Sequence, residues 1–76
     1  MQIEHLITMA NQIGDFFKAF PDQQQAKKDI AQHLQRFWAK SMRDQIAEYI
    51  NQGGDALLPI VKAAIVEYIH ITQHET

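Results

Sequence analysis

The chain has 76 residues, of which 46% are hydrophobic and 21% are charged, a composition typical of small folded domains rather than disordered tails. Seven Lys plus Arg against nine Asp plus Glu give a formal net charge of -2, so no positive excess is present to gather nucleic acid or an anionic membrane. The absence of cysteine excludes disulfide scaffolds, thiol nucleophiles and thiolate metal sites. We therefore expect a single domain over residues 1–76.

We expect neither a secretory signal near the N-terminus nor a membrane-spanning segment in this sequence. Glu4 stands near the N-terminus, where a secretory signal would have a basic region and then an unbroken apolar run. The most apolar stretch, residues 56–71, contains a proline and charged residues such as Lys62 and Glu67. It is also shorter than the roughly 20 apolar residues that a membrane-spanning helix needs. We expect a cytoplasmic protein that binds neither membranes nor nucleic acid.

Apolar residues at spacings of three and four predict a first helix over residues 3–20. Polar side chains such as Asn11 and Asp15 lie on the opposite face, which is the pattern of a helix with one buried side. Pro21 ends this helix, because the residue before a proline is pushed out of helical geometry. The stripe expected to enter the core consists of Ile3, Leu6, Ile7, Ala10, Ile13, Phe16, Phe17 and Phe20.

A second helix is predicted from Asp22, a favourable N-cap residue, to Trp38. Its apolar stripe does not continue in phase, because polar residues occupy the next positions of the same face. The apolar residues resume on a shifted face from Met42 onward. This slip predicts a break and a third helix that starts at Ser41, with Asp44 completing a capping box. The second stripe is Ala26, Ile30, Leu34, Phe37 and Trp38, and the third is Met42, Ile46, Tyr49 and Ile50.

Gly53 and Gly54 end the third helix, and a fourth is predicted to begin at Asp55 or Pro59. This last helix runs towards Ile71 and is apolar nearly all round, so one side is either an interface or a set of scattered surface hydrophobic residues. Short connections favour antiparallel packing, and the predicted fold is all-α, a small bundle of four short helices. One face would hold Leu57, Val61, Ala64, Ile65, Tyr68 and Ile69, and the other Leu58, Ile60, Ala63, Val66 and Ile71.

The small size of the chain itself suggests a partner. Below about 70–80 residues one core rarely supplies more than a few kcal/mol, and this chain has no disulfide to add to it. Oligomerisation or docking on a larger protein is the remaining way to cover apolar surface.

Two groups of titratable residues are candidates for chemistry. Asp29 and His33 stand four apart on the second helix, where the carboxylate can orient the imidazole, but surface ion pairs have the same spacing. Glu67, His70 and His74 place a carboxylate and two imidazoles on one helical face, which suits a zinc or iron half-site. A di-iron bundle needs that motif twice and two further carboxylates. Since it occurs once, near the chain end, we expect no metal site and no catalytic residues.

Three cations surround Trp38 in the sequence: Arg36, Lys40 and Arg43. Such a group can hold a phosphate or stack on a base. It also suits protein binding, because Trp and Arg are frequent energetic anchors of interfaces. The alternative is that Trp38 is a central core residue and the cations form a solvated rim.

Four pieces of the sequence occur in a characteristic order. They are residues 9–17 (Met-Ala-Asn-Gln-Ile-Gly-Asp-Phe-Phe), His33-Leu34 followed by Phe37-Trp38, then Met42-Arg43, and Gly53-Gly54 followed by Leu57 and Pro59. Over about residues 5–65 this arrangement resembles the delta subunit of NAD-dependent, molybdenum-containing formate dehydrogenases. The chain departs from the family at Lys40 and Ser41, where the family usually has a proline followed by an arginine.

The resemblance implies a small non-catalytic subunit that accompanies a large cytoplasmic formate-oxidising complex and supports its maturation, cofactor loading or stability. In that complex the catalytic (alpha) subunit carries a molybdenum cofactor and iron-sulfur clusters, while flavin and NAD bind to other subunits, so this chain itself would bind no cofactor. The residues expected to contact the partner are Phe37, Trp38, Met42, Arg43, Gly53, Gly54, Leu57 and Pro59.

Two alternatives to this accessory role remain open. One is a free-standing helical adaptor that forms a homodimer through its last helix. The other is a small metal-dependent enzyme that uses Glu67, His70 and His74. Copurification with a partner and metal analysis distinguish these from the accessory role.

Overall fold

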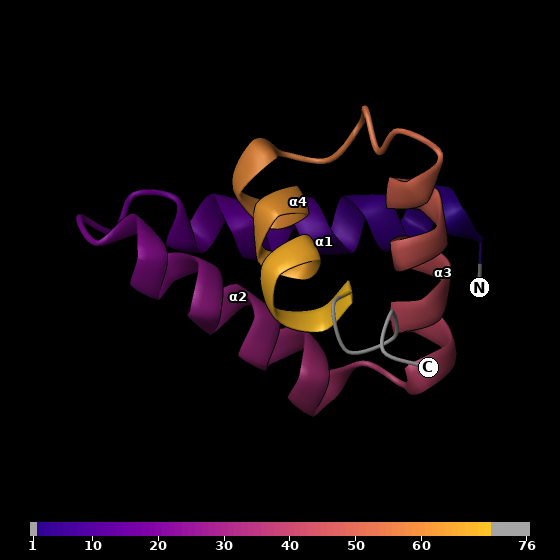
Figure 1. Ribbon diagram of the computed structural model, residues 1–76, viewed down its shortest axis with the longest axis horizontal. Helices are drawn as coiled ribbons and strands as arrows, with labels where there is room; N and C mark the ends of the chain where they lie inside the picture. Colours follow the sequence, from indigo (N-terminus) through magenta and orange to yellow (C-terminus); the bar gives the residue numbers. More distant parts are fainter. Residues whose placement is uncertain (1, 71–76) are drawn as a thin grey trace.

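The computed structural model describes residues 2–70, and these form four α-helices and a final π-helical turn (Figure 1). The helices are α1 (Ile3–Phe17), α2 (Gln23–Phe37), α3 (Lys40–Asn51) and α4 (Pro59–Ile65), and the π-helical turn is η1 (Val66–His70). No strand occurs within this described part of the chain. The predicted all-α fold with four short helices is confirmed.

The helices are arranged as an antiparallel pair crossed by two others. In Figure 1, α1 runs towards the turn that joins the two helices and α2 runs back from that turn in the opposite chain direction, while α3 and α4 lie across this pair. Helix α1 contacts each of the other three helices, and α2 packs closely against α4. The antiparallel packing expected from short connections is therefore found for α1 and α2. It is not found for α3 and α4, which cross this pair.

The turn between α1 and α2 is held by side-chain caps. Helix α1 ends before Phe20, its expected end, and the side chain of Gln23 donates hydrogen bonds to the carbonyl oxygens of Lys18 at 3.0 Å and Phe20 at 2.8 Å. Such contacts satisfy carbonyl groups that a helix end leaves without a partner. The predicted cap of α2 is confirmed, because Oδ1 of Asp22 accepts a hydrogen bond from the N–H of Gln25 at 3.1 Å.

The break between α2 and α3 is where the slip in phase placed it, but its cap is different. Trp38 and Ala39 are both extended, with ψ angles of 139° and 154°, and α3 begins directly afterwards at Lys40. The prediction that Ser41 caps this helix is wrong, since Ser41 lies inside its first turn and Ala39 is the N-cap. The carboxylate of Asp44 instead accepts from Nζ of Lys40 at 2.9 Å.

Two glycines close α3 as predicted. Gly53 and Gly54 have φ angles of 128° and 62°, in the region that residues with a side chain rarely adopt. Their N–H groups donate to the carbonyl oxygens of Ile50 and Tyr49, respectively, which is the hydrogen-bond pattern of a Schellman motif. The last helix was expected to begin at Asp55 or at Pro59, and it begins at Pro59. Proline is tolerated there because the first turn of a helix does not need its N–H group.

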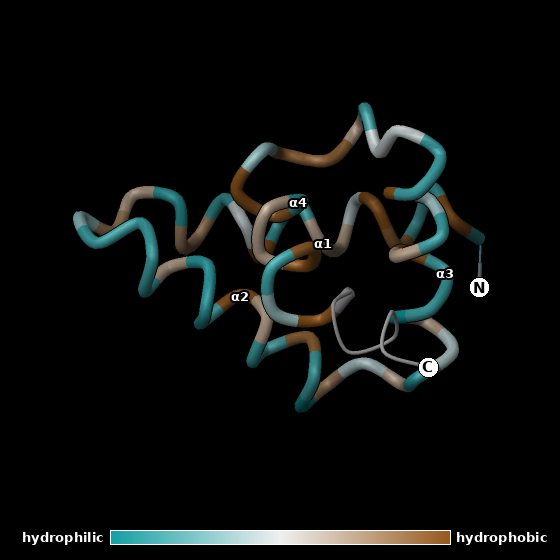
Figure 2. The backbone as a smooth tube through the Cα atoms, in the orientation of Figure 1, coloured by the Kyte–Doolittle hydropathy of each residue, from teal (hydrophilic) through white to brown (hydrophobic). Residues whose placement is uncertain are grey.

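All four helices and η1 contribute to one apolar core. Figure 2 shows apolar positions concentrated in α1, in α4 and in the connection before α4, whereas α2 is mostly hydrophilic outside a narrow stripe. Trp38 is part of this core, which agrees with the interpretation of this tryptophan as a core residue. The buried members are Leu6, Ala10, Ile30, Ala31, Leu34, Trp38, Ile46, Ile50, Leu57, Val61, Ala64, Ile65 and Ile69.

The apolar surplus expected on the last helix is small in the described residues. Leu58 and Ile60 pack against the core and are half-buried, and Val66 is the large apolar side chain of this segment that is exposed. Ile71 lies outside the described residues. The greatest exposure of large apolar side chains is found elsewhere, at Phe16 and Phe37, which are 67% and 70% exposed. Their assignment to buried stripes is therefore wrong, and so is that of Phe20, which is 36% exposed and lies beyond the end of α1.

Within residues 2–70, no helix combines the length and the apolar character that crossing a membrane requires.

Candidate functional site

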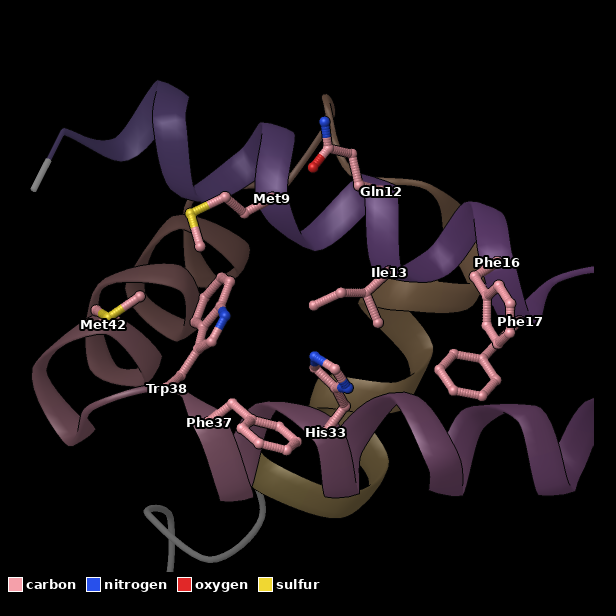
Figure 3. A pocket seen from close by; sticks show the side chains of 9 residues that line it. All are labelled: Met9, Gln12, Ile13, Phe16, Phe17, His33, Phe37, Trp38 and Met42. Carbon is pink, nitrogen blue, oxygen red and sulfur yellow. The ribbon is translucent and has the colours of Figure 1, made fainter.

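An apolar groove of about 530 Å³ opens between α1, α2 and the first turn of α3 (Figure 3). Helix α1 forms one wall, the end of α2 forms the other, and Trp38 and Met42 lie where α2 gives way to α3. The residues that line it are Met9, Gln12, Ile13, Phe16, Phe17, His33, Phe37, Trp38 and Met42.

Aromatic rings make up the two walls of this groove. The rings of Phe16 and Phe17 meet edge to face with centroids 4.9 Å apart, which is a favourable geometry for an aromatic pair. On the opposite wall the ring of His33 lies against Phe37 at 4.8 Å. Phe16 and Phe37 are mostly exposed, whereas Trp38 is only 6% exposed and lines the end of the groove near α3 (Figure 3). The groove is therefore an apolar surface that the fold of one chain leaves uncovered.

Three of the predicted contact residues, Phe37, Trp38 and Met42, come together in this groove. The sequence could point to these three residues because they are neighbours along the chain, at the place where the apolar stripe shifts to another face between α2 and α3. The α1 wall was missed as a binding surface. Phe16 was assigned to the core by its spacing, and only the observed crossing of α1 and α2 shows that its ring stays outside.

Arg43 has a structural contact of its own. Its Nη1 donates a hydrogen bond to the carbonyl oxygen of Gln35 at 3.3 Å, in the last turn of α2. A cation at this position satisfies a free carbonyl group and interacts favourably with the negative end of the helix dipole. Arg43 therefore stabilises the α2–α3 corner, beside Met42 and the groove.

The remaining predicted contacts, in the segment 53–59, lie away from the groove. None of these residues lines it. Leu57 is buried in the core, Gly54 is buried against Ile50, and Pro59 is exposed at the start of α4. The structure thus separates the expected contact residues into a groove and a loop.

Asn11 of α1 holds that loop in place. Its Nδ2 donates to the carbonyl oxygen of Ala56 and its Oδ1 accepts from the N–H of Leu58, both at 2.9 Å. The hydroxyl of Tyr49 accepts from the N–H of Ala56 at 2.9 Å, and Nζ of Lys62 donates to the carbonyl oxygen of Gly53 at 2.6 Å. Side chains from α1, α3 and α4 therefore fix the loop, whose backbone groups have no helix or strand to pair with.

Gly14 allows α4 to approach α1. A Cβ atom built on Gly14 would clash with Cγ2 of Val61 and would lie 3.2 Å from Cδ1 of Leu58. Asn11 and Gly14 both belong to the segment 9–17 that carries the resemblance. The sequence placed Asn11 on the face turned away from the core, whereas it contacts the loop, and it assigned no role to Gly14. Their partners lie more than 40 residues away, and no local signal identifies such contacts.

The two groups considered for chemistry are engaged in other contacts. Oδ1 of Asp29 accepts a hydrogen bond from Nε2 of Gln25 at 3.0 Å, and no hydrogen bond joins Asp29 to His33 in the described part of the chain. Glu67 forms an ion pair with Lys27 at 2.9 Å, which ties η1 to α2. This hydrogen bond from Lys27 is the main cause that lowers the pKa of the Glu67 carboxyl group; desolvation opposes it and a contact from Gln24 assists it.

Of the three candidate metal ligands, only Glu67 has a side chain among the described residues. The side chain of His70, and all of His74, lie outside the described residues. Within the described part, no three His, Cys, Asp or Glu side chains form a cluster that could hold a metal ion. The ion pair with Lys27 gives Glu67 a structural role that needs no metal.

Comparison with protein families identifies the chain. A family model described as "NADH-dependant formate dehydrogenase delta subunit FdsD" matches residues 5–65. The chain belongs to this family. The resemblance noted in the sequence is thereby confirmed, and the matched region covers the groove, the Asn11 clamp and all of α4. No curated protein and no solved structure matched the chain.

Membership in the delta-subunit family implies a formate dehydrogenase complex with NAD and other cofactors. The residues of this chain do not suit an iron-sulfur cluster, since its sequence contains no cysteine to supply thiolate ligands. The groove offers aromatic, aliphatic and thioether side chains together with Gln12 and His33. Such a lining suits the apolar side chains of another protein.

Proposed function

We propose that this delta-family chain is a non-catalytic accessory subunit. It binds the catalytic subunit of a cytoplasmic, NAD-dependent molybdenum formate dehydrogenase and supports maturation, cofactor loading or stability of that enzyme. The observation that carries the proposal is the exposed apolar groove on a member of the delta-subunit family. Exposed apolar side chains that gather in one groove favour a protein-binding role.

The chemistry of the groove supports binding rather than catalysis. General acid or base catalysis needs a tuned titratable group within hydrogen-bond reach of a reacting atom, commonly oriented by a second polar group. In the groove, His33 is the single titratable side chain, and it packs against Phe37 instead of a carboxylate. Exposed aromatic rings, by contrast, supply large contact areas when they are buried in an interface.

The contact surface that we propose has two parts. Phe37 and Met42 offer apolar contacts in the groove beside the buried Trp38, and Arg43 holds the adjoining corner. The second part is the clamped loop, in which Gly53, Gly54 and Leu57 determine the backbone path and Pro59 is exposed. The rigid clamp preorganises this loop, which lowers the entropy cost of binding.

Activity per bound molybdenum tests the accessory role. The enzyme complex is purified from cells with and without this chain, and formate oxidation is divided by the molybdenum content. We expect the yield of intact or molybdenum-loaded enzyme to fall without the chain, while the activity per molybdenum stays constant. A sharp fall in that ratio would show that the chain takes part in turnover.

The homodimeric adaptor predicts a different result. If the chain acts alone, affinity purification from the native cytoplasm recovers only further copies of the chain, and enzyme yield does not depend on it. Recovery of the catalytic subunit, abolished when the bait is unfolded, supports the accessory role.

A further inference from the structure

We propose that the α1–α2 groove binds one amphipathic helix of the catalytic subunit, which inserts apolar side chains over two turns and places a carboxylate beside Arg36 and His33. This inference rests on the proposed function, and it specifies which surface docks and what chemistry it recognises. Four features of the groove support it: its length, its closed backbone, its charge and the orientation of His33.

The length of the groove matches a short helical segment. The α1 wall extends from Met9 to Phe16, which is about 10 Å, or two helical turns, at the rise of an α-helix. A docking helix therefore presents anchors at positions i, i+3 or i+4, and i+7, which is the usual spacing for a helix in a groove. The volume of about 530 Å³ is in the range of binding clefts that hold several bulky side chains.

The backbone of the walls favours a helix over an extended segment. The groove lies along α1 and α2, whose interior N–H and C=O groups are already paired within the helices. An extended segment would find no backbone partners on these walls, and its own peptide groups would lose water without compensation. A helix satisfies its own backbone and buries only side chains.

Charge is distributed unevenly along the groove. At the Phe16 end, Asp15 is paired with Lys18 at 2.9 Å, so that end is neutral. At the Phe37 end, Lys40 is paired with Asp44 at 2.9 Å, while Arg43 has no carboxylate partner among residues 2–70. Arg36, next to Phe37, is exposed and forms no ion pair within residues 2–70. The Phe37 end is therefore positive and complements a carboxylate.

His33 adds a polar contact within the apolar wall. Its ring projects from α2 towards α1 across the groove (Figure 3), and no hydrogen bond to it is found among the described residues. An imidazole in this position can donate to a carboxylate on the docking helix. A second copy of this chain can bind here only more weakly than a partner that supplies a carboxylate, because a twofold pairing through the Phe37 end brings two positive corners together.

Site-directed variants of the full chain test the proposal by binding to the purified catalytic subunit. Phe37→Asp and Phe16→Asp are expected to weaken binding by roughly tenfold or more, since each replaces an apolar anchor with a charge. Both rings are mostly exposed, so the fold should be kept, which circular dichroism checks. Val66→Asp, at an exposed apolar position outside the groove, is the matched control and should bind like the original chain.

The charge argument has its own pair of variants. Arg36→Glu is expected to weaken binding and to reduce its dependence on salt, whereas Lys28→Glu, an exposed reversal on the same helix, is expected to have little effect. Equal effects of the two reversals would show that only net charge matters and would overturn the assigned carboxylate.

Crosslinking identifies the occupant directly. Benzoylphenylalanine in place of Phe37 is irradiated in the assembled complex, and the crosslinked peptide is mapped. Attachment to a helix of the catalytic subunit with apolar residues at i, i+3 or i+4, and i+7 and an acidic residue at one end supports the proposal. Attachment to a second copy of the chain, or to a segment without that pattern, overturns it.

Failure of this inference differs from failure of the proposed function. If the unaltered chain does not bind the catalytic subunit, the proposed function is wrong, and this inference fails with it. If the unaltered chain binds and the groove variants bind equally well, only the docking site is wrong.

Discussion

Asn11 contributes a pair of long-range hydrogen bonds that one substitution removes. In Asn11→Ala the N–H of Leu58, which is partly buried, loses its acceptor, and the carbonyl oxygen of Ala56 loses its donor. We expect a loss of about 1–3 kcal/mol in the free energy of unfolding, measured by chemical denaturation. Asn11→Asp keeps the acceptor for Leu58 but turns a carboxylate oxygen towards the carbonyl oxygen of Ala56, so it should also destabilise the chain. Gln12→Ala at the exposed neighbouring position should be nearly neutral. Equal stability of all four proteins would contradict the clamp.

Gly14 gives a prediction in which two effects oppose each other. Alanine is the better helix former by about 1 kcal/mol, so an unstrained Gly14→Ala would stabilise α1. Here the new methyl group meets Val61, which is fully buried and cannot turn away. Overpacking costs about 1–3 kcal/mol, so we expect net destabilisation.

A double-mutant cycle isolates that contact. Val61→Ala removes the atom that clashes, so Gly14→Ala should be less costly, or even favourable, in the Val61→Ala background. Unfolding free energies of the four proteins give the coupling. Additive effects would show that Gly14 is not needed for the close approach of α4.

The α2–α3 corner depends on Arg43 as well as on the core. Arg43→Glu replaces the donor to the carbonyl oxygen of Gln35 with a carboxylate, which repels that oxygen and the negative end of α2. We expect a loss of about 1–2 kcal/mol in unfolding free energy, with Arg36→Glu as the control that lacks this contact. Trp38→Ala is more severe, at about 3–5 kcal/mol, because the indole is buried. Binding tests at the corner are therefore cleaner with Phe37.

The ion pair between η1 and α2 makes part of the stability depend on pH. The Lys27 ammonium holds the pKa of the Glu67 carboxyl group below its ordinary value of 4.5. A carboxyl group with a lowered folded-state pKa stabilises the fold fully above its unfolded value, and this contribution is lost as the pH falls through the lowered pKa. Glu67→Gln should therefore destabilise the chain at neutral pH, and the difference should vanish in acid.

Lys27→Gln supplies the control for that titration. Without the ammonium, the pKa of Glu67 returns towards its ordinary value, and the pH dependence of the Glu67→Gln difference should flatten. Thermal unfolding from pH 7 to pH 3 measures this pH dependence on the original chain, on each single variant and on the double variant Glu67→Gln/Lys27→Gln. A difference that stays constant over this range would refute the linkage.

The sequence predicted those features of the elements that depend on near neighbours. Asp22 caps α2 through a residue three positions away, and Gly53 and Gly54 close α3 through backbone angles alone. The slip in phase located the break between α2 and α3, but the N-cap residue of α3 was not predicted. That residue is Ala39, whose side chain cannot form a capping hydrogen bond, so the sequence favoured Ser41 instead. The exposure of Phe37 was missed because it depends on where α1 crosses α2.

At the scale of the whole molecule, the groove predicts how the isolated chain behaves. Without its partner, Phe16 and Phe37 stay in water, which favours reversible self-association at tens of micromolar concentration. Light scattering coupled to size exclusion should show a mass above that of one chain for the original protein and a monomer for Phe37→Asp. Val66→Asp should still associate, because the last helix has little exposed apolar surface among the residues described. Adding the catalytic subunit should dissociate the oligomer, since both contacts use the same rings. A monomer at all concentrations would show that the exposed rings alone do not drive association, and an oligomer that persists beside saturating catalytic subunit would place self-association on another surface.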